Sequence, residues 1–235
     1  MTQAKYKIIE EHIMKMIDSG ELKAGDQIMT EEQLSRMFSF SRMTINKALN
    51  RLQDSGYIKR TPGRGSFVSA PVVRKPSISI TSFTEDMKLI GLHAGSKLIS
   101  YEVIKAAAVP EIRDKLHLTD NDMVHHFVRL RTGNNIPIAV TYNYVSVRIV
   151  PAIDISSLDS SFYGYLDSIG IRRVAKDMEL SATLPNAQQK ELLQIDNAAL
   201  LCSAHVTYTI FNNKQVPFEY SKTFYNGDSY SYIFS

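Results

Sequence analysis

The chain has 235 residues, of which 44% are apolar, and a formal net charge of +3. This length allows two modest hydrophobic cores, and the single cysteine, Cys202, excludes an internal disulfide, as is typical of a reducing cytoplasm. The first residues have no apolar signal core, and no apolar run approaches membrane-spanning length. We therefore expect a soluble, cytoplasmic protein.

Positive charge is concentrated in the first third of the chain. Residues 1–75 hold 13 Lys and Arg against 8 Asp and Glu, whereas the remaining residues hold 14 against 16. Such an uneven distribution favours a nucleic-acid partner for the N-terminal part of the protein.

Residues 30–56 have the pattern of two short helices joined by a tight turn. Thr30, with Gln33 three residues later, forms a capping box that opens the first helix. Ser41 is a suitable N-cap for a second helix that runs to about residue 54, where Gly56 ends it. Two short helices in this arrangement predict a helix-turn-helix.

The exposed side of the second helix is basic and rich in hydrogen-bond donors. When each position is advanced by 100°, the apolar residues fall on one arc and the polar residues fill the rest. In the major groove, Arg pairs with guanine and Asn with adenine, and Arg42 and Asn46 lie one turn apart on the same side. The predicted DNA-contacting residues of the two helices and their caps are Thr30, Ser41, Arg42, Met43, Thr44, Asn46 and Lys47.

A cationic hairpin is predicted directly after the second helix. Pro62 followed by Gly63 suits a type II turn between two short strands. Cationic side chains in such a wing can contact phosphates or enter the minor groove, and glycines let the backbone approach closely. The wing residues expected on DNA are Lys59, Arg60, Gly63, Arg64 and Gly65. We expect a homodimer that binds double-stranded DNA at a short palindrome, because operator symmetry mirrors protein symmetry.

A second domain is predicted after a short linker. Residues 70–76 lack periodicity and include two prolines, so we expect a semi-rigid linker between domains over 1–69 and 77–235. Residues 82–85 form another capping box, which opens a short helix that Gly91 closes. Alternating segments predict strands at 98–104, 123–131, 136–147, 177–183, 200–211 and 216–224, and helices are expected at 110–116, 161–169 and 186–195. The second domain is therefore expected to be α+β with an antiparallel sheet.

Two predicted hairpins in this domain share an Asn-Asn turn and carry charged residues. Arg129 and Arg131 share one face of the first hairpin, and Glu219 lies in the second. Arginine is a forked, permanently charged partner for an anion, and the predicted helix start at Ser161 also favours negative charge. The pattern indicates a small-anion site, although an exposed strand face would have the same spacing.

Residues 20–68 resemble the DNA-binding domain of the GntR family of bacterial transcriptional regulators. The resemblance is carried by SRMTINKAL at 41–49, which looks most like the HutC subgroup, and by GRGSFV at 63–68. It implies a winged helix-turn-helix in which Arg42, Thr44 and Asn46 lie on the operator, with Arg42 as the main base reader. Asn46 stands where many family members have Arg.

Residues 77–235 resemble the UTRA effector-binding domain of the same subgroup, whose fold is similar to that of chorismate lyase. The motifs are SFTEDM at 82–87, VRLR at 128–131, SSFYGYL at 160–166 and PFEYS at 217–221. The resemblance implies a sugar-phosphate effector, with the phosphate and the sugar held by different residues. The phosphate would contact Arg129, Arg131, Ser161, Tyr163 and a hydroxyl of the turn from Ser82 to Thr84, and the sugar would contact Glu219 and Tyr225. Thr141 stands where amino-sugar sensors tend to have an acid, which leaves the sugar identity open.

Three classes of function are compatible with this sequence. We expect a ligand-responsive transcriptional regulator, which by family default is a repressor relieved by a small anionic metabolite such as a sugar phosphate. Within this class, the effector could instead be a non-phosphorylated carboxylate similar to urocanate. A lyase-type enzyme and a constitutive DNA-architectural protein are the alternatives, and we expect no enzyme because no catalytic base is evident. The 6 histidines show no ligand spacing, so neither a metal nor another cofactor is expected.

Overall fold

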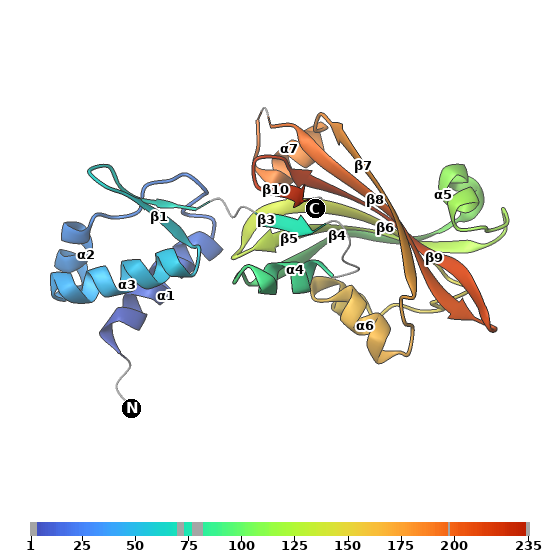
Figure 1. Ribbon diagram of the computed structural model, residues 1–235, viewed down its shortest axis with the longest axis horizontal. Coiled ribbons are helices and arrows are strands. Elements are labelled where there is room, and N and C mark those ends of the chain that lie inside the picture. The colour runs from blue at the N-terminus through green and yellow to red at the C-terminus, as the bar shows by residue number, and fades with distance from the viewer. Residues whose placement is uncertain (1–3, 70–72, 77–81, 197, 234–235) are drawn as a thin grey trace. The chain divides into compact units, whose positions relative to one another are not determined.

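The computed structural model describes residues 4–69, 73–76, 82–196 and 198–233 (Figure 1). The chain divides into two compact units. The first comprises Met1–Pro71 with two short segments, Met87–Ala94 and Gly133–Ile136, and the second comprises Val72–Asp86, Gly95–Thr132 and Pro137–Ser235. In the described residues, no helix is both long and apolar enough to cross a membrane.

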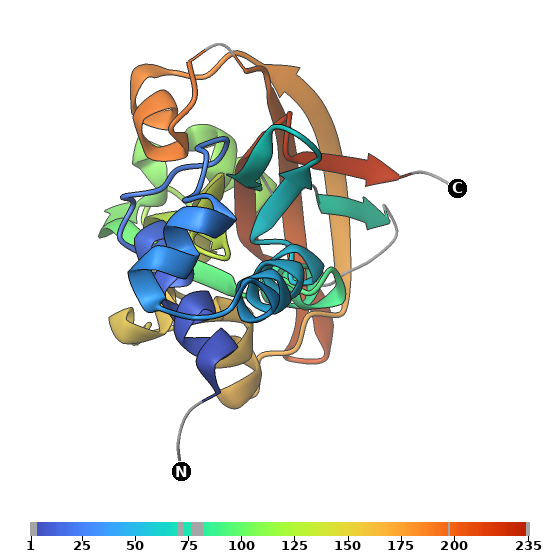
Figure 2. The same ribbon diagram turned by 90° about the vertical axis from the view of Figure 1, so that its left-hand side faces the viewer.

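The first unit is a winged helix-turn-helix with one more helix than the sequence analysis predicted. Its helices are α1 (Lys5–Asp18), α2 (Glu31–Phe38) and α3 (Arg42–Asp54), and its antiparallel hairpin consists of β1 (Ile58–Thr61) and β2 (Gly65–Val68). Figure 2 shows the three helices and the hairpin. Helices α2 and α3 and the hairpin are confirmed, whereas α1 is an addition.

The ends of α2 and α3 are set by the expected side-chain caps. The hydroxyl of Thr30 accepts a hydrogen bond from the Gln33 backbone at 3.2 Å, and the Gln33 side chain accepts one from the Thr30 backbone at 2.8 Å. Ser39 takes a left-handed conformation (φ 53°) that closes α2, and the Ser41 hydroxyl caps α3 by accepting from Thr44 N at 3.3 Å. The tight turn between these caps brings the start of α3 to the surface of the unit.

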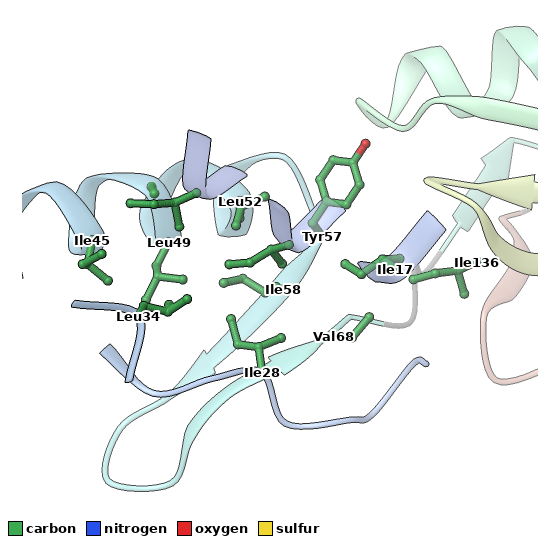
Figure 3. Close-up of a cluster of buried hydrophobic side chains, with 13 residues drawn as sticks. Ile17, Ile28, Leu34, Ile45, Leu49, Leu52, Tyr57, Ile58, Val68 and Ile136 are labelled. Carbon is green, nitrogen blue, oxygen red and sulfur yellow. The ribbon is translucent and has the colours of Figure 1, made fainter. Parts of the chain in front are cut away.

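Apolar side chains from the helices and the hairpin form the core of this unit (Figure 3). On α1, Ile9, Ile13 and Ile17 repeat every fourth residue and are buried, as expected for one face of an amphipathic helix. They pack with Ile28, Leu34, Ile45, Ala48, Leu49, Leu52, Tyr57, Ile58 and Val68. Burial of each large apolar side chain contributes about 1.5–3 kcal/mol, so this core orients α3 and the hairpin with respect to each other.

The second unit is α+β and is built on a six-stranded sheet in the order β4-β5-β6-β9-β8-β7 (Figure 1). Its strands are β4 (Ala94–Lys105), β5 (Met123–Gly133), β6 (Ile136–Ser146), β7 (Ala175–Thr183), β8 (Leu200–Phe211) and β9 (Lys214–Asn226). The pairs β6–β9, β7–β8 and β8–β9 are antiparallel. The helices are α4 (Phe83–Leu89), α5 (Pro110–Lys115), α6 (Phe162–Ser168) and α7 (Ala187–Leu193), with 3-10 turns at Ala106–Ala108 and Ile155–Asp159. All the expected strands and helices of this domain are present.

A small second sheet lies where the linker was predicted. Strand β3 (Val73–Pro76) pairs in parallel with β10 (Tyr230–Ile233) at the other end of the chain. The semi-rigid linker expected over 70–76 thus contains a strand at 73–76, while 70–72 lie outside the described residues.

The two faces of the large sheet are covered by different helices. Because side chains alternate along a strand, Phe127 and Arg129 of β5 point to one face and Val124 and Val128 to the other. Phe127 packs edge-on against Phe162 of α6, with ring centroids 5.1 Å apart. Val124 belongs to the cluster that includes residues of α5, and Val128 to the one that includes residues of α7. The arginine pair therefore lies on the α6 face.

Candidate functional site

The first turns of α3 present Arg42, the expected main base reader, to solvent. Arg42 and Lys47 are exposed, and the apolar side chain of Met43 is 82% exposed beside them. Ser41 and Thr44 are bonded to each other through their hydroxyls at 2.9 Å. This end of α3 therefore offers a cation and an apolar side chain, which suit a guanine edge and a thymine methyl group respectively.

The hairpin has the turn that its sequence predicted. Arg64 N donates to Thr61 O at 3.0 Å, and Gly63 has φ 73°, as the third position of a type II turn requires. Gly65 has φ 114°, a conformation that residues with a side chain rarely adopt. Lys59 and Arg64 are exposed on this hairpin.

Asn46 and Arg60, both predicted to contact DNA, are bonded within the unit. Arg60 Nη2 donates to Asn46 Oδ1 at 2.9 Å and to Glu31 Oε1, while its Nη1 donates to Asn50 Oδ1 at 2.5 Å. Asn46 Nδ2 in turn donates to Glu31 Oε2 at 2.8 Å. The sequence analysis missed this cluster because its members come from α2, α3 and β1.

The second unit contains a polar cavity on the α6 face of its sheet. It opens to solvent, and the side chains that line it are mostly polar. Eight of the nine predicted effector residues line it: Ser82, Thr84, Arg129, Arg131, Thr141, Ser161, Tyr163 and Tyr225. The predicted capping box at the start of α4, formed by Ser82 and Glu85, fixes the turn that contains Ser82 and Thr84.

The two arginines are buried and incompletely paired. Arg129 is 6% exposed and Arg131 is 4% exposed. Among the described residues, Nε and Nη1 of Arg129 and Nε of Arg131 meet no hydrogen-bond acceptor. The Arg131 guanidinium lies 4.6 Å from the centre of the Phe83 ring, and that of Arg129 lies 5.6 Å from the centre of the Phe162 ring.

Burial makes both charges unfavourable in the unliganded cavity. It lowers the pKa of Arg129 to about 10, although the carboxylate of Glu219 opposes the effect. Burial, and then the like charge of Arg129, lower the pKa of Arg131 well below its ordinary value. An anion in the cavity would remove both penalties, because it would supply acceptors and opposite charge.

Glu219, the ninth predicted residue, does not line the cavity. It is fully buried, and its carboxylate accepts hydrogen bonds from Tyr163 Oη and Asn143 Nδ2, each at 2.9 Å. Burial raises the pKa of Glu219, and these hydrogen bonds oppose the shift. In this structure Glu219 therefore lies behind the cavity wall and supports two lining residues, Tyr163 and Asn143.

Several lining residues were not predicted. Three of them lie on neighbouring strands at matching registers, since Asn143 pairs with Ser221, which pairs with His205. Thr141 and Thr223 pair in the same way, with their hydroxyls 3.1 Å apart. The two-residue spacing of these polar positions was the signal available in the sequence. The additional lining residues are Phe83, Asp86, Asn143, Phe162, Lys176, His205, Ser221 and Thr223.

These two units define a class of protein. A winged helix-turn-helix with an exposed basic helix, followed in one chain by a unit with a small-molecule cavity, is the architecture of a ligand-responsive transcriptional regulator. Residues 5–68 match the family described as "Bacterial regulatory proteins, gntR family", and residues 90–231 match the UTRA domain. The chain therefore belongs to the GntR family and is consistent with its HutC subgroup, as the resemblance implied.

Similar proteins agree with this assignment. The chain is 32% identical over 232 residues to the HTH-type transcriptional repressor NagR of Bacillus subtilis, covering 97% of this chain and 93% of the relative. It is 25% identical over 228 residues to the mannosyl-D-glycerate transport/metabolism system repressor MngR of Escherichia coli, with 97% and 93% coverage. The crystal structure of PhnF from Mycobacterium smegmatis has the same fold, with a TM-score of 0.63, 22% identity and coverage of 96% and 97%.

Proposed function

We propose that this protein is a dimeric transcriptional repressor that leaves its operator when a sugar phosphate occupies the cavity of the second unit. The observation that carries this proposal is the pair of buried guanidinium groups, Arg129 and Arg131, in which Nε and Nη1 of the first and Nε of the second lack acceptors among the described residues. A buried charge that lacks a partner is costly, so such a pair is explained by a ligand that provides one.

The chemistry of the cavity favours a phosphate over a single carboxylate. A phosphate has three terminal oxygens, enough to accept from both forked guanidinium groups and from hydroxyls. The nearby hydroxyls belong to Ser82, Thr84 and Ser161. A carboxylate has two oxygens and would leave more of these donors unpaired.

The remaining wall suits a hydroxylated molecule. Thr141, Asn143 and Thr223 offer donors and acceptors from adjacent strands, and Tyr225 adds an aromatic ring that stacks on Tyr230 at a centroid distance of 3.7 Å. Sugars present alternating hydroxyls and apolar ring faces, which this combination fits. The name of MngR refers to mannosyl-D-glycerate, a sugar derivative with a carboxylate and no phosphate, so it supports the sugar part of the proposal and not the phosphate.

DNA binding is assigned to the exposed start of α3 and to the tip of the hairpin. Arg42 would read a base, while Lys59 and Arg64 would contact phosphates, with Met43 and Lys47 beside them on α3. A homodimer would place two copies of α3 in successive major grooves of a palindromic operator.

Thermal-shift titration tests the effector proposal. Phosphorylated sugars, the same sugars without phosphate, and carboxylates such as urocanate are compared at equal concentrations. The phosphorylated form should stabilise the protein most, by about 2.7 kcal/mol at a hundred times its dissociation constant.

Matched variants locate the site. Arg131→Met and Arg129→Met should lose the stabilisation by ligand, whereas Arg148→Met, at an exposed arginine outside the cavity, should keep it. If a neutral or cationic compound were the best ligand, and its effect survived both cavity substitutions, the proposed effector class would be wrong.

A further inference from the structure

In addition to the apolar core, the polar side chain of Arg60 links the hairpin to α3. From β1 its guanidinium reaches the carboxylate of Glu31 at the start of α2 and the side-chain amides of Asn46 and Asn50 on α3. The Arg60 and Glu31 side chains are 26% and 38% exposed, so the ion pair is partly shielded from water. One forked group therefore connects three separate elements of the unit.

We propose that Arg60 is a positioning residue, which fixes the wing and the Asn46 amide with respect to α3, and not a ligand of DNA phosphates. This inference deepens the DNA binding proposed above and depends on it. Contacts with three acceptors on two helices use the planar fork of arginine, which a lysine cannot reproduce.

Both the nitrogen and the oxygen of the Asn46 side-chain amide already form hydrogen bonds within the unit. Its Nδ2 donates to Glu31 Oε2 at 2.8 Å and to Arg42 O at 3.3 Å, and its Oδ1 accepts from Arg60 at 2.9 Å. A bidentate contact with adenine needs this same donor and this same acceptor. In this arrangement the hydrogen bonds of Asn46 help to hold α3 in place. Bases would then be read by Arg42 and its exposed neighbours.

Arg64 provides the internal comparison. It lies at the tip of the same hairpin and its side chain is exposed, while its backbone carbonyl accepts from Gln27 Nε2 at 3.1 Å. Two arginines of one wing thus have different surroundings, and we expect different roles for them: Arg64 contacts phosphate and Arg60 orients the elements that do so.

The first arm of the test measures coupling without DNA. Unfolding by urea is followed for the full chain with Glu31→Gln, Arg60→Met and the double variant. Because the two residues share one contact and also make others, the double variant should lose less stability than the sum of the losses in the two single variants. The matched pair Glu31→Gln and Arg64→Met should be additive. Additive midpoints for Glu31 and Arg60 would overturn the contact itself.

The second arm measures binding to an operator selected from random DNA by the wild-type protein. Removing a phosphate contact reduces the slope of log affinity against log salt by about 0.9. Arg64→Met should show that reduction. Arg60→Met should keep the wild-type salt slope and the wild-type affinity for random DNA. Its affinity for the selected operator should fall by about tenfold, because the side chains that read bases would be less well positioned.

Arg60→Lys separates the two roles most directly. A phosphate ligand would be rescued by lysine, which also binds phosphate, whereas a positioning fork would not. A reduced salt slope in Arg60→Met together with rescue in Arg60→Lys would overturn the inference. If the wild-type protein selected no DNA sequence, the proposed function would fail, and the urea arm would still decide whether Arg60 and Glu31 act as one contact.

Discussion

Replacing Arg131 by methionine should remove effector binding without destabilising the unliganded protein. Arg131 is buried, lies beside a second arginine, and has a pKa well below its ordinary value because burial and Arg129 both disfavour its charge. Methionine has a similar length, no charge and favourable contacts with aromatic rings, so it can replace the packing against Phe83. This substitution therefore shows whether Arg131 serves to bind a ligand or to stabilise the folded protein.

The size of the effect follows from two opposing contributions. Burying an ion costs several kcal/mol even after the surroundings relax, and the like charge of Arg129 adds to that cost. The contact with Phe83, at 4.6 Å from the ring centre, returns about 2 kcal/mol. We therefore expect Arg131→Met to raise the free energy of unfolding by about 1–3 kcal/mol, where each kcal/mol corresponds to about 2–4 °C in Tm.

Calorimetry with and without ligand gives the result directly. The Tm of unliganded Arg131→Met should equal or exceed that of the wild type, and its rise on adding the best phosphorylated ligand should vanish. Arg148→Met serves as the control for loss of a surface charge. A loss of about 3–5 kcal/mol in the unliganded variant, as expected when one partner of a buried pair is removed, would refute the reasoning and make Arg131 a structural residue.

Three further predictions follow from individual contacts. Ser41→Ala removes the cap of α3 and should lower the free energy of unfolding by about 1 kcal/mol, measured by urea denaturation, whereas an unchanged midpoint would show that the cap is dispensable. Arg42→Ala should cost about 1–3 kcal/mol of specific DNA affinity and relax preference at one base of each half-site, and unchanged specific binding in a gel-shift titration would contradict the docking of α3. Burial raises the pKa of Glu219 above its ordinary value of 4.5. Between pH 4.5 and the raised pKa, the Glu219 carboxyl is therefore protonated in the folded state and ionised in the unfolded state. Stability should therefore fall as pH rises from about 4.5 through the raised pKa, by up to about 1.4 kcal/mol per pH unit, and Glu219→Gln should flatten that dependence in urea titrations across pH. An identical pH profile in that variant would mean that another group titrates.

Local signals in the sequence predicted most elements of the fold. Helices α2 and α3 begin at capping residues, and the hairpin turns at Pro62 and Gly63, so short segments contain enough information to define them. Helix α1 was missed although Ile9, Ile13 and Ile17 repeat at helical spacing, because its N-cap, Ala4, offers no side-chain hydrogen bond.

Contacts between distant segments were the part that could not be predicted. Strand β3 depends on pairing with β10, which begins more than 150 residues later, and nothing in Val73–Pro76 alone indicates that partner. The eight lining residues that were predicted correctly as a group were found from a family resemblance combined with the alternation of side chains along strands. The position of Glu219 behind the cavity wall could not be predicted, because its hydrogen bonds to Tyr163 and Asn143 depend on packing between α6 and the sheet.

The cluster around Arg60 illustrates the same limit on a smaller scale. A basic residue in a predicted wing was assigned to DNA, although three acceptors on α2 and α3 hold it in the structure. Arg64, four residues further on, has the same chemistry and an exposed side chain. Residue type identified both as cations, and only the fold distinguished their surroundings.

Control of DNA binding by an anion beside Arg129 and Arg131, in the polar cavity of the second unit, is tested most directly by one titration. Fluorescence anisotropy of a labelled operator, selected by the wild-type protein, is followed as the best phosphorylated sugar is added to the wild type and to Arg131→Met. We predict that both proteins bind the operator equally well without ligand, and that the sugar phosphate releases only the wild type. Release of both proteins at the same concentration, or of neither by any anionic sugar, would contradict the account.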